Sequence, residues 1–276
     1  MARRAPRRRR GARGFAAAIG GAVLICVALA ATTALAVFYF TTPKSPTLDA
    51  STLCPVDGHR GITVVLVDTS DDILSTTRQD IIRLLRDQVK GLPEYHLFDI
   101  RVLDPVNAKS RSLFSKCNPG DGNGLSEWTA NPRLARMRWL ESFDQPATQA
   151  VNNSLAPAKA KTSPIMASLQ DIALSQFSDP PVQSLPKHLV VISDMIEFTK
   201  DYSQYPNAGD LSYQRFLKSS AYLKYRTDLH GAAVSIEYIV REGLKIDSIK
   251  HIEFWNTWIK DNRGAFKIAH RLQGTN

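Results

Sequence analysis

Residues 62–72 read ITVVLVDTSDD, an uninterrupted apolar run that ends at an aspartate followed by a polar turn. A strand without alternation of apolar and polar residues is covered on both faces, which is typical of parallel sheets. A second such run, Leu189–Ser193, also ends at an aspartate, Asp194. The two stretches predict central strands of a parallel sheet, each with a carboxylate at its carboxyl end.

Predicted strands and helices alternate along the rest of the chain. Further strands are expected at about Tyr95–Leu103, Ser112–Lys116, Ala233–Val240 and Phe266–Arg271. Helices are expected at about Thr77–Val89, Pro132–Phe143, Ser163–Phe177, Tyr213–Thr227 and Ser248–Lys260. This alternation predicts one α/β domain over residues 55–273, with a doubly wound, mostly parallel sheet and helices on both faces.

Two helix starts carry sequence signals. Thr77, with Asp80 three residues later, resembles a capping box. Ser163 precedes Pro164, so we expect Ser163 to cap a helix whose first turn holds the proline. Residues 148–161, rich in Ala, Asn and Pro, allow no assignment.

The N-terminal forty residues do not resemble a globular domain. Residues 1–14 contain seven Arg and no acid, and residues 15–40 contain no charge. As a helix, this second stretch would be about 39 Å long, more than the ~30 Å hydrocarbon core requires. We therefore expect an Arg-rich cytoplasmic stub at 1–14, a transmembrane helix at 15–40 in contact with the lipid bilayer, and a short linker at 41–54.

The arginines predict the orientation of this anchor. Positive residues stay in the cytoplasm, so the domain would lie in the periplasm or outside the cell, tethered to the inner (cell) membrane. A cleaved signal peptide is the alternative, because Ala34-Leu35-Ala36 has the form of a cleavage site. Apolar residues continue beyond that site and exceed the usual 7–15 of a signal peptide, which favours an uncleaved anchor.

The net charge of +9 comes mainly from the stub. Outside residues 1–14 there are 28 basic and 26 acidic residues, a balance of +2. A nucleic-acid-binding face needs an excess of positive charge, so no nucleic acid is expected as a partner of the folded domain. Of the three cysteines, Cys54 and Cys117 fall in the exported part, where disulfides persist; a pair, or a buried free thiol, are both open.

The residues at the strand ends resemble a known family. A strand followed by Asp68-Thr69-Ser70, hydroxyl residues at the start of a middle helix, and a strand ending in Ser193-Asp194 are similar to the von Willebrand factor A-type domain, here of a membrane-anchored bacterial kind. The resemblance covers most of residues 55–273.

The resemblance implies a metal-ion-dependent adhesion site. Its predicted ligands are Asp68, Ser70, Asp72, Thr162 or Ser163, and Asp194. Asp72 stands where the family has Ser, and Met195 stands where it often has Gly, so the site is degenerate. Carboxylate and hydroxyl oxygens suit hard cations, and Mg²⁺ or Mn²⁺ is the expected cofactor if a metal binds.

The family's strand order also implies a disulfide. Its third strand runs antiparallel, which would bring Cys117 to the edge where Cys54 leads into the first strand, so a Cys54–Cys117 bond is expected.

Two functions follow from these observations. The leading interpretation is a non-enzymatic, membrane-anchored module that binds a protein partner outside the cytoplasm. The alternative is an exported metal-dependent hydrolase that uses Asp68, Asp72 and Asp194. No nucleophile or general base accompanies these carboxylates in the sequence, so we expect no enzyme.

Overall fold

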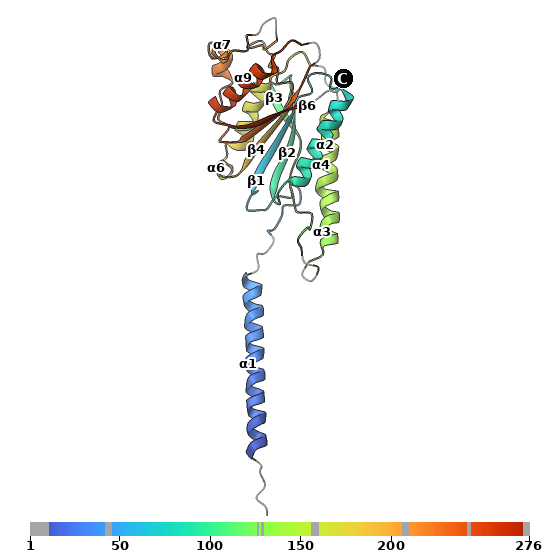
Figure 1. The fold of residues 1–276 in the computed structure, drawn as a ribbon, viewed down its shortest axis with the longest axis vertical. Helices are drawn as coiled ribbons and strands as arrows, with labels where there is room; N and C mark the ends of the chain where they lie inside the picture. Colours follow the sequence, from blue (N-terminus) through green and yellow to red (C-terminus); the bar gives the residue numbers. More distant parts are fainter. Residues whose placement is uncertain are drawn as a thin grey trace, which may run out of the picture. The chain divides into compact units, whose positions relative to one another are not determined.

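The apolar run that opens the domain forms strand β1 (Gly61–Val67), with all seven residues buried. In this computed structural model (Figure 1), the described residues are 11–41, with side chains from 21, and then 46–125, 127, 130–155, 160–205, 210–241 and 244–272. The unassigned segment 148–161 is helical up to Ser154, and its residues 156–159 lie outside the described part.

A six-stranded sheet has the order β3-β2-β1-β4-β5-β6. The strands besides β1 are β2 (His96–Asp104), β3 (Lys109–Cys117), β4 (Lys187–Ser193), β5 (Ala233–Ile239) and β6 (Ala265–Leu272). All neighbouring pairs are parallel except β2 with β3. The predicted doubly wound, mostly parallel sheet is confirmed, and β1 and β4 are direct neighbours at its centre.

Helices cover both faces of the sheet (Figure 1). One face carries α2 (Ser75–Gly91), α3 (Pro132–Trp139), a π-helical turn (Leu140–Asp144) and α4 (Gln145–Ser154). The other carries α5 (Ile165–Ile172), a π-helical turn (Ala173–Phe177), α6 (Pro180–Gln183), α7 (Tyr213–Leu217), α8 (Ser220–Lys224) and α9 (Ser248–Asp261).

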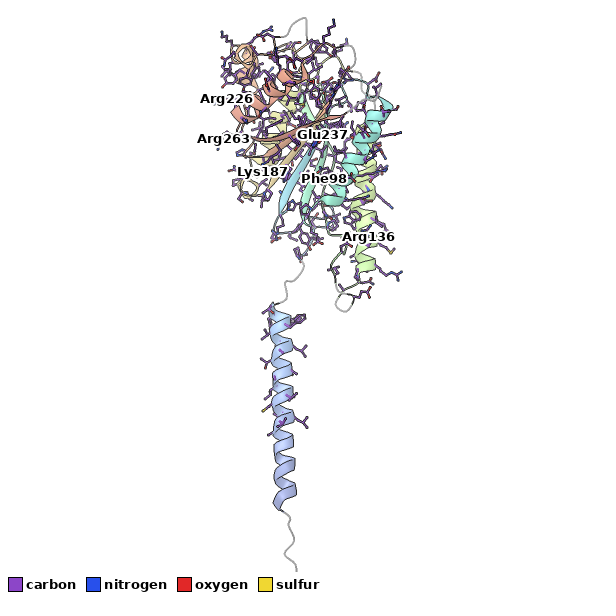
Figure 2. The ribbon with its side chains drawn as sticks, viewed as in Figure 1. Phe98, Arg136, Lys187, Arg226, Glu237 and Arg263 are labelled. Atoms are coloured by element: carbon purple, nitrogen blue, oxygen red, sulfur yellow. A yellow bond between two sulfur atoms is a disulfide. The ribbon has the colours of Figure 1, made fainter. Side chains whose placement is uncertain are left out.

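Two apolar cores lie on the two faces because alternate residues of a strand point to opposite sides. Val64 and Leu66 of β1 pack with α5 and α9, whereas Val65 and Val67 pack with α2 and α4. In the second core, the aromatic ring of Phe98 on β2 (Figure 2) is fully buried. This explains why β1 shows no alternation in the sequence: both of its faces are interior.

The helix starts differ from the sequence signals. The structure begins α2 at Ser75, before Thr77, and no side chain caps it, so the predicted capping box is wrong. Helix α5 begins at Ile165, with Pro164 at the N-cap and no side-chain cap, so Ser163 is not the cap either. The Ser163 hydroxyl is instead used by an aspartate of the sheet, as described below.

The chain divides into two units, residues 1–46 and 47–276. Helix α1 (Gly11–Thr41) lies in the first unit, and its part from residue 21 to 41 is the one helix in the described chain that is long and apolar enough to span a membrane. The predicted linker, 41–54, extends across this division. Its last residues belong to the folded unit, because Leu48 pairs with Pro55.

The Cys54–Cys117 disulfide is present, and it joins this lead-in to the end of β3. The backbone N–H of Cys117 also donates to the carbonyl of Thr52, at 2.9 Å. The antiparallel course of β3 brings Cys117 beside the lead-in, as the family resemblance implied. Among described residues, the remaining cysteine is Cys26 in α1, which is free.

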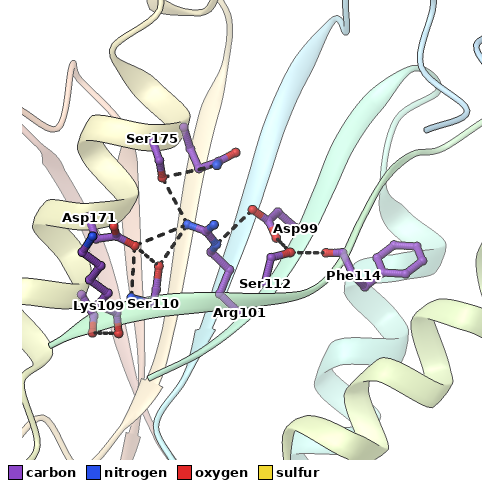
Figure 3. Close-up of polar contacts among 10 residues, drawn as sticks. Asp99, Arg101, Lys109, Ser110, Ser112, Phe114, Asp171 and Ser175 are labelled. Atoms are coloured by element: carbon purple, nitrogen blue, oxygen red, sulfur yellow. Dashed lines mark hydrogen bonds and ion pairs between the residues drawn. The ribbon is translucent and has the colours of Figure 1, made fainter. Parts of the chain in front are cut away.

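A buried ion pair fixes the antiparallel edge of the sheet (Figure 3). The guanidinium of Arg101 on β2 lies 3.2 Å from the carboxylate of Asp99 and 3.8 Å from that of Asp171 on α5. Asp171 in turn accepts from the backbone N–H and hydroxyl of Ser110 on β3, and Asp99 accepts from the hydroxyl of Ser112. Strand β3 is therefore tied to a helix as well as to β2.

Candidate functional site

Asp68 lies at the carboxyl end of β1 and accepts hydrogen bonds from three groups. The backbone N–H of Ser70 donates to Oδ1 at 2.9 Å, and the hydroxyls of Ser163 and Ser193 donate to Oδ2 at 3.2 and 2.7 Å. Asp68 is 3% exposed, so these donors replace the water that a free carboxylate would bind. Its position is set by β4, since its own N–H donates to the carbonyl of Ile192.

Asp194, at the end of the neighbouring strand β4, is bound by an arginine that comes just after β5. The Nε of Arg241 donates to its Oδ2 at 2.7 Å, and the N–H of Ile196 donates to Oδ1 at 2.9 Å. Burial, followed by the nearby Asp68 carboxylate, raises the pKa of Asp194 to about 6, although Arg241 acts in the opposite direction. Of the two carboxylates that end adjacent strands, Asp194 is therefore the one in direct contact with a cation.

The remaining nitrogens of Arg241 hold the loop that follows β1. One terminal nitrogen donates to the carbonyl oxygen of Asp72 at 2.8 Å, and the other lies 3.2 Å from the carboxylate of Asp71. The Arg241 side chain is 18% exposed and that of Asp71 is 47% exposed, so this end of the cluster reaches solvent. A single arginine therefore links the loops after β1 and β4.

An aromatic rim borders the cluster. Phe198 is 40% exposed, and its backbone pairs in both directions with that of Ser163. Its ring contacts that of Tyr205 edge to face, with centroids 5.0 Å apart. Burial, followed by the carboxylates of Asp71 and Asp194, raises the pKa of Tyr205.

Glu197, which directly precedes Phe198 in the chain, is fully buried. The Oε2 of Glu197 accepts from the N–H of Met166, in the first turn of α5, at 2.8 Å. Its Oε1 has no hydrogen-bond partner in the described part of the chain. Burial raises the pKa of Glu197 to about 8, against the lowering effect of the helix N–H groups. The raised pKa favours the protonated, neutral form of this side chain.

The structure brings together four of the six predicted site residues: Asp68, Ser70, Ser163 and Asp194. Thr162 is elsewhere, because its hydroxyl donates to the carbonyl of Pro105 at 3.4 Å. Asp72 is exposed and contributes its backbone carbonyl to Arg241.

Sequence reasoning missed three members of the site, Ser193, Tyr205 and Arg241. Ser193 was visible as the last residue of a predicted strand. Arg241 follows the alternating run Ala233–Val240, and any residue just after a parallel strand falls at the same edge of the sheet. Tyr205 had no such signal, since it comes from an irregular segment.

As they stand, these contacts do not fit a divalent cation. Both oxygens of Asp194 already accept from N–H groups, and one of those donors carries a fixed positive charge. The described residues contain no group of three His, Cys, Asp or Glu side chains arranged to hold a metal. The buried Ser70 Oγ has no hydrogen-bond partner there, but a single free hydroxyl does not make up a coordination sphere.

The strand order, the antiparallel β3 and the paired aspartates at the ends of β1 and β4 define a von Willebrand factor A-like fold. No protein-family model matches the sequence, and no curated protein matches it significantly.

Solved structures with similarity to this chain are remote. A von Willebrand factor type A protein from Catenulispora acidiphila is 14% identical, with a TM-score of 0.40, and the match covers 77% of this chain and 39% of that one. The conserved hypothetical protein BatB from Bacteroides thetaiotaomicron is 15% identical, with a TM-score of 0.37 and coverage of 78% and 92%. An aerotolerance-related membrane protein from Bacteroides fragilis is 15% identical, with a TM-score of 0.35 and the same coverage. These are likenesses of fold alone.

Proposed function

We propose that this chain is a membrane-anchored interaction module that binds a protein partner, outside the cytoplasm, at the carboxyl edge of its sheet. The observation that carries the proposal is the partly exposed Arg241–Asp71 pair beside the aromatic rim of Phe198 and Tyr205. Arginine and tyrosine are enriched among the residues that dominate binding energy at protein interfaces. The neighbouring carboxylates are engaged by hydrogen-bond donors, an arrangement that suits recognition better than catalysis.

The alternative of a metal-dependent hydrolase has less support. It requires Asp68, Asp72 and Asp194 to share one cation, whereas Asp72 turns its carbonyl oxygen toward Arg241. We therefore propose a non-enzymatic role. Turnover of phosphoesters by the purified chain with Mn²⁺, lost in Asp68→Ala, would contradict it.

Site-specific photo-crosslinking in intact cells tests the binding face. A photoreactive phenylalanine analogue at Phe198 is expected to give a crosslinked protein adduct, because this aromatic side chain borders the charged cluster. Asp194→Ala should abolish the adduct by releasing Arg241, with the folded unit retained. The measurement is the yield of adduct on denaturing gels, with the captured protein identified by mass spectrometry.

Leu223 on α8 provides the matched control. It is 75% exposed, more than Phe198, so the analogue at this position reports non-specific encounters. Equal adducts from both positions, or an adduct at Phe198 that survives Asp194→Ala, would contradict the proposed face.

The orientation of the anchor gives a separate prediction. Seven Arg precede the apolar helix, and such residues are retained in the cytoplasm. We expect a periplasmic phosphatase fused after residue 276 to be active, and a fluorescent protein that matures only in the cytoplasm to be dark there. Changing the seven Arg to Ser should reduce this asymmetry. The reverse pattern of the two reporters would place the folded unit in the cytoplasm and remove the proposed setting.

A further inference from the structure

We propose that Arg241 is the built-in cation of this site and that the site works without a divalent metal ion. The inference rests on the proposed function only in assigning the site to partner binding. The identity of the cation can be tested on the purified chain with no partner present.

The geometry of the guanidinium carries the argument. Its three nitrogens reach three acceptors on two loops: the Asp194 carboxylate, the Asp71 carboxylate and the Asp72 carbonyl oxygen. A metal ion in this fold would be expected to join the same two loops by binding oxygens from both. Arg241 makes these links with hydrogen bonds, and its fork of N–H donors matches carboxylate geometry.

Two serine hydroxyl groups satisfy the second carboxylate that a metal ion would otherwise bind, that of Asp68. The hydroxyl groups of Ser163 and Ser193 both donate hydrogen bonds to the Asp68 carboxylate. Asp68 is thereby satisfied by neutral donors, and Asp194 is satisfied by the arginine. Each of the two buried carboxylates thus has hydrogen-bond donors of its own, so neither needs an added ion to offset the cost of its burial.

The exposed contact of the arginine indicates what a partner would offer. The ion pair to Asp71 is the contact nearest to solvent, with the Asp71 side chain 47% exposed, so water screens it more than the buried contact to Asp194. A carboxylate on the partner can take the place of Asp71 on the same guanidinium. The site would then bind an acidic side chain through an arginine, where a metal-dependent site would use the ion.

Titration with Mn²⁺ and Mg²⁺ tests the proposal on the full chain in detergent micelles. By calorimetry and Mn²⁺ spin resonance, the wild-type chain should bind neither ion at this site. Arg241→Ser removes the fixed charge and frees Asp194, so it should gain Mn²⁺ binding with Kd of about 10⁻⁴–10⁻³ M, as at weak cation sites. Adding Asp194→Asn to that variant should remove the gained binding.

Arg60→Ser is the matched control, because Arg60 also pairs with an aspartate, Asp57, but lies before β1. It should bind no ion. Wild-type binding that Asp194→Asn abolishes would overturn the proposal, as would absence of binding in both the wild type and folded Arg241→Ser.

If Arg241→Ser unfolds, Arg241→Gln replaces it; if both unfold, the wild-type titration decides. Loss of the Phe198 adduct in EDTA would also overturn it, whereas absence of any adduct would count against the proposed function alone.

Discussion

Removal of the Cys54–Cys117 bond is expected to lower the free energy of unfolding by about 4 kcal/mol. The bond closes a loop of 63 residues, and chain-entropy estimates for loops of this length give that value. This is a large part of the ~5–15 kcal/mol by which folded domains are stable. The measurement is denaturant unfolding of the full chain in micelles, followed by the fluorescence of the buried Trp255 and Trp258.

Two comparisons separate the covalent link from the packing of the side chains. The Cys54→Ala/Cys117→Ala variant loses both, because Cys117 is fully buried, whereas reduction of the wild type loses the link alone. Reductant should therefore destabilise the wild type and leave the variant unchanged. Cys26→Ala, in the apolar helix, should behave as the wild type. Equal stability of oxidised and reduced wild type would show that the link does not constrain the unfolded chain.

Glu197→Gln is expected to remove a loss of stability that the wild type shows on going from pH 6.5 to 8. The pKa of Glu197 is raised from 4.5 to about 8 in the fold, so in this window the folded state holds a proton that the unfolded chain has released. The contribution of Glu197 to the free energy of unfolding is therefore fully present below the unfolded pKa. It falls by about 1.4 kcal/mol per pH unit as the pH rises toward the folded pKa. The expected loss from pH 6.5 to 8 is about 2 kcal/mol.

The difference between the wild type and Glu197→Gln over this window isolates this residue, because the other groups titrate alike in both chains. The pKa of Asp194 is raised to about 6, so its contribution is mostly lost before pH 6.5, and the pKa of His251 is lowered to about 4 by burial. Glutamine is uncharged, and its carbonyl oxygen can accept from the Met166 N–H. Glu253→Gln, at an exposed position of α9, should follow the wild type. A Glu197→Gln variant with the wild-type slope would show that Glu197 is already ionised in the fold.

The fold was predictable because its signal is local. Each predicted strand was found within a few residues, since Ile62–Val67 and Leu189–Ser193 are continuous apolar runs that only a doubly covered sheet can bury. Boundaries that depend on tertiary contacts were less predictable. The helix expected over Tyr213–Thr227 is two short helices, α7 and α8, and the segment around residues 145–154 became α4 through packing on β2.

The candidate site was only half predictable. Asp68 and Asp194 follow strands whose order the family resemblance supplied, so their proximity could be expected. Ser163 was assigned to the wrong task, because a serine before a proline has the sequence of a cap whether its hydroxyl turns to the helix or to a carboxylate. The role of Arg241 depends on a contact between residues 47 positions apart, which no local pattern encodes.

The disulfide at the entry of the folded unit also has a mechanical consequence. A pulling force on the tether enters this unit at residue 47 and reaches Cys54 before it reaches β1. There the covalent link divides the load between β1 and the far end of β3, the strands on either side of β2. The load thus reaches two strands that both pair with β2, whereas a chain without the link would pass it to β1 alone.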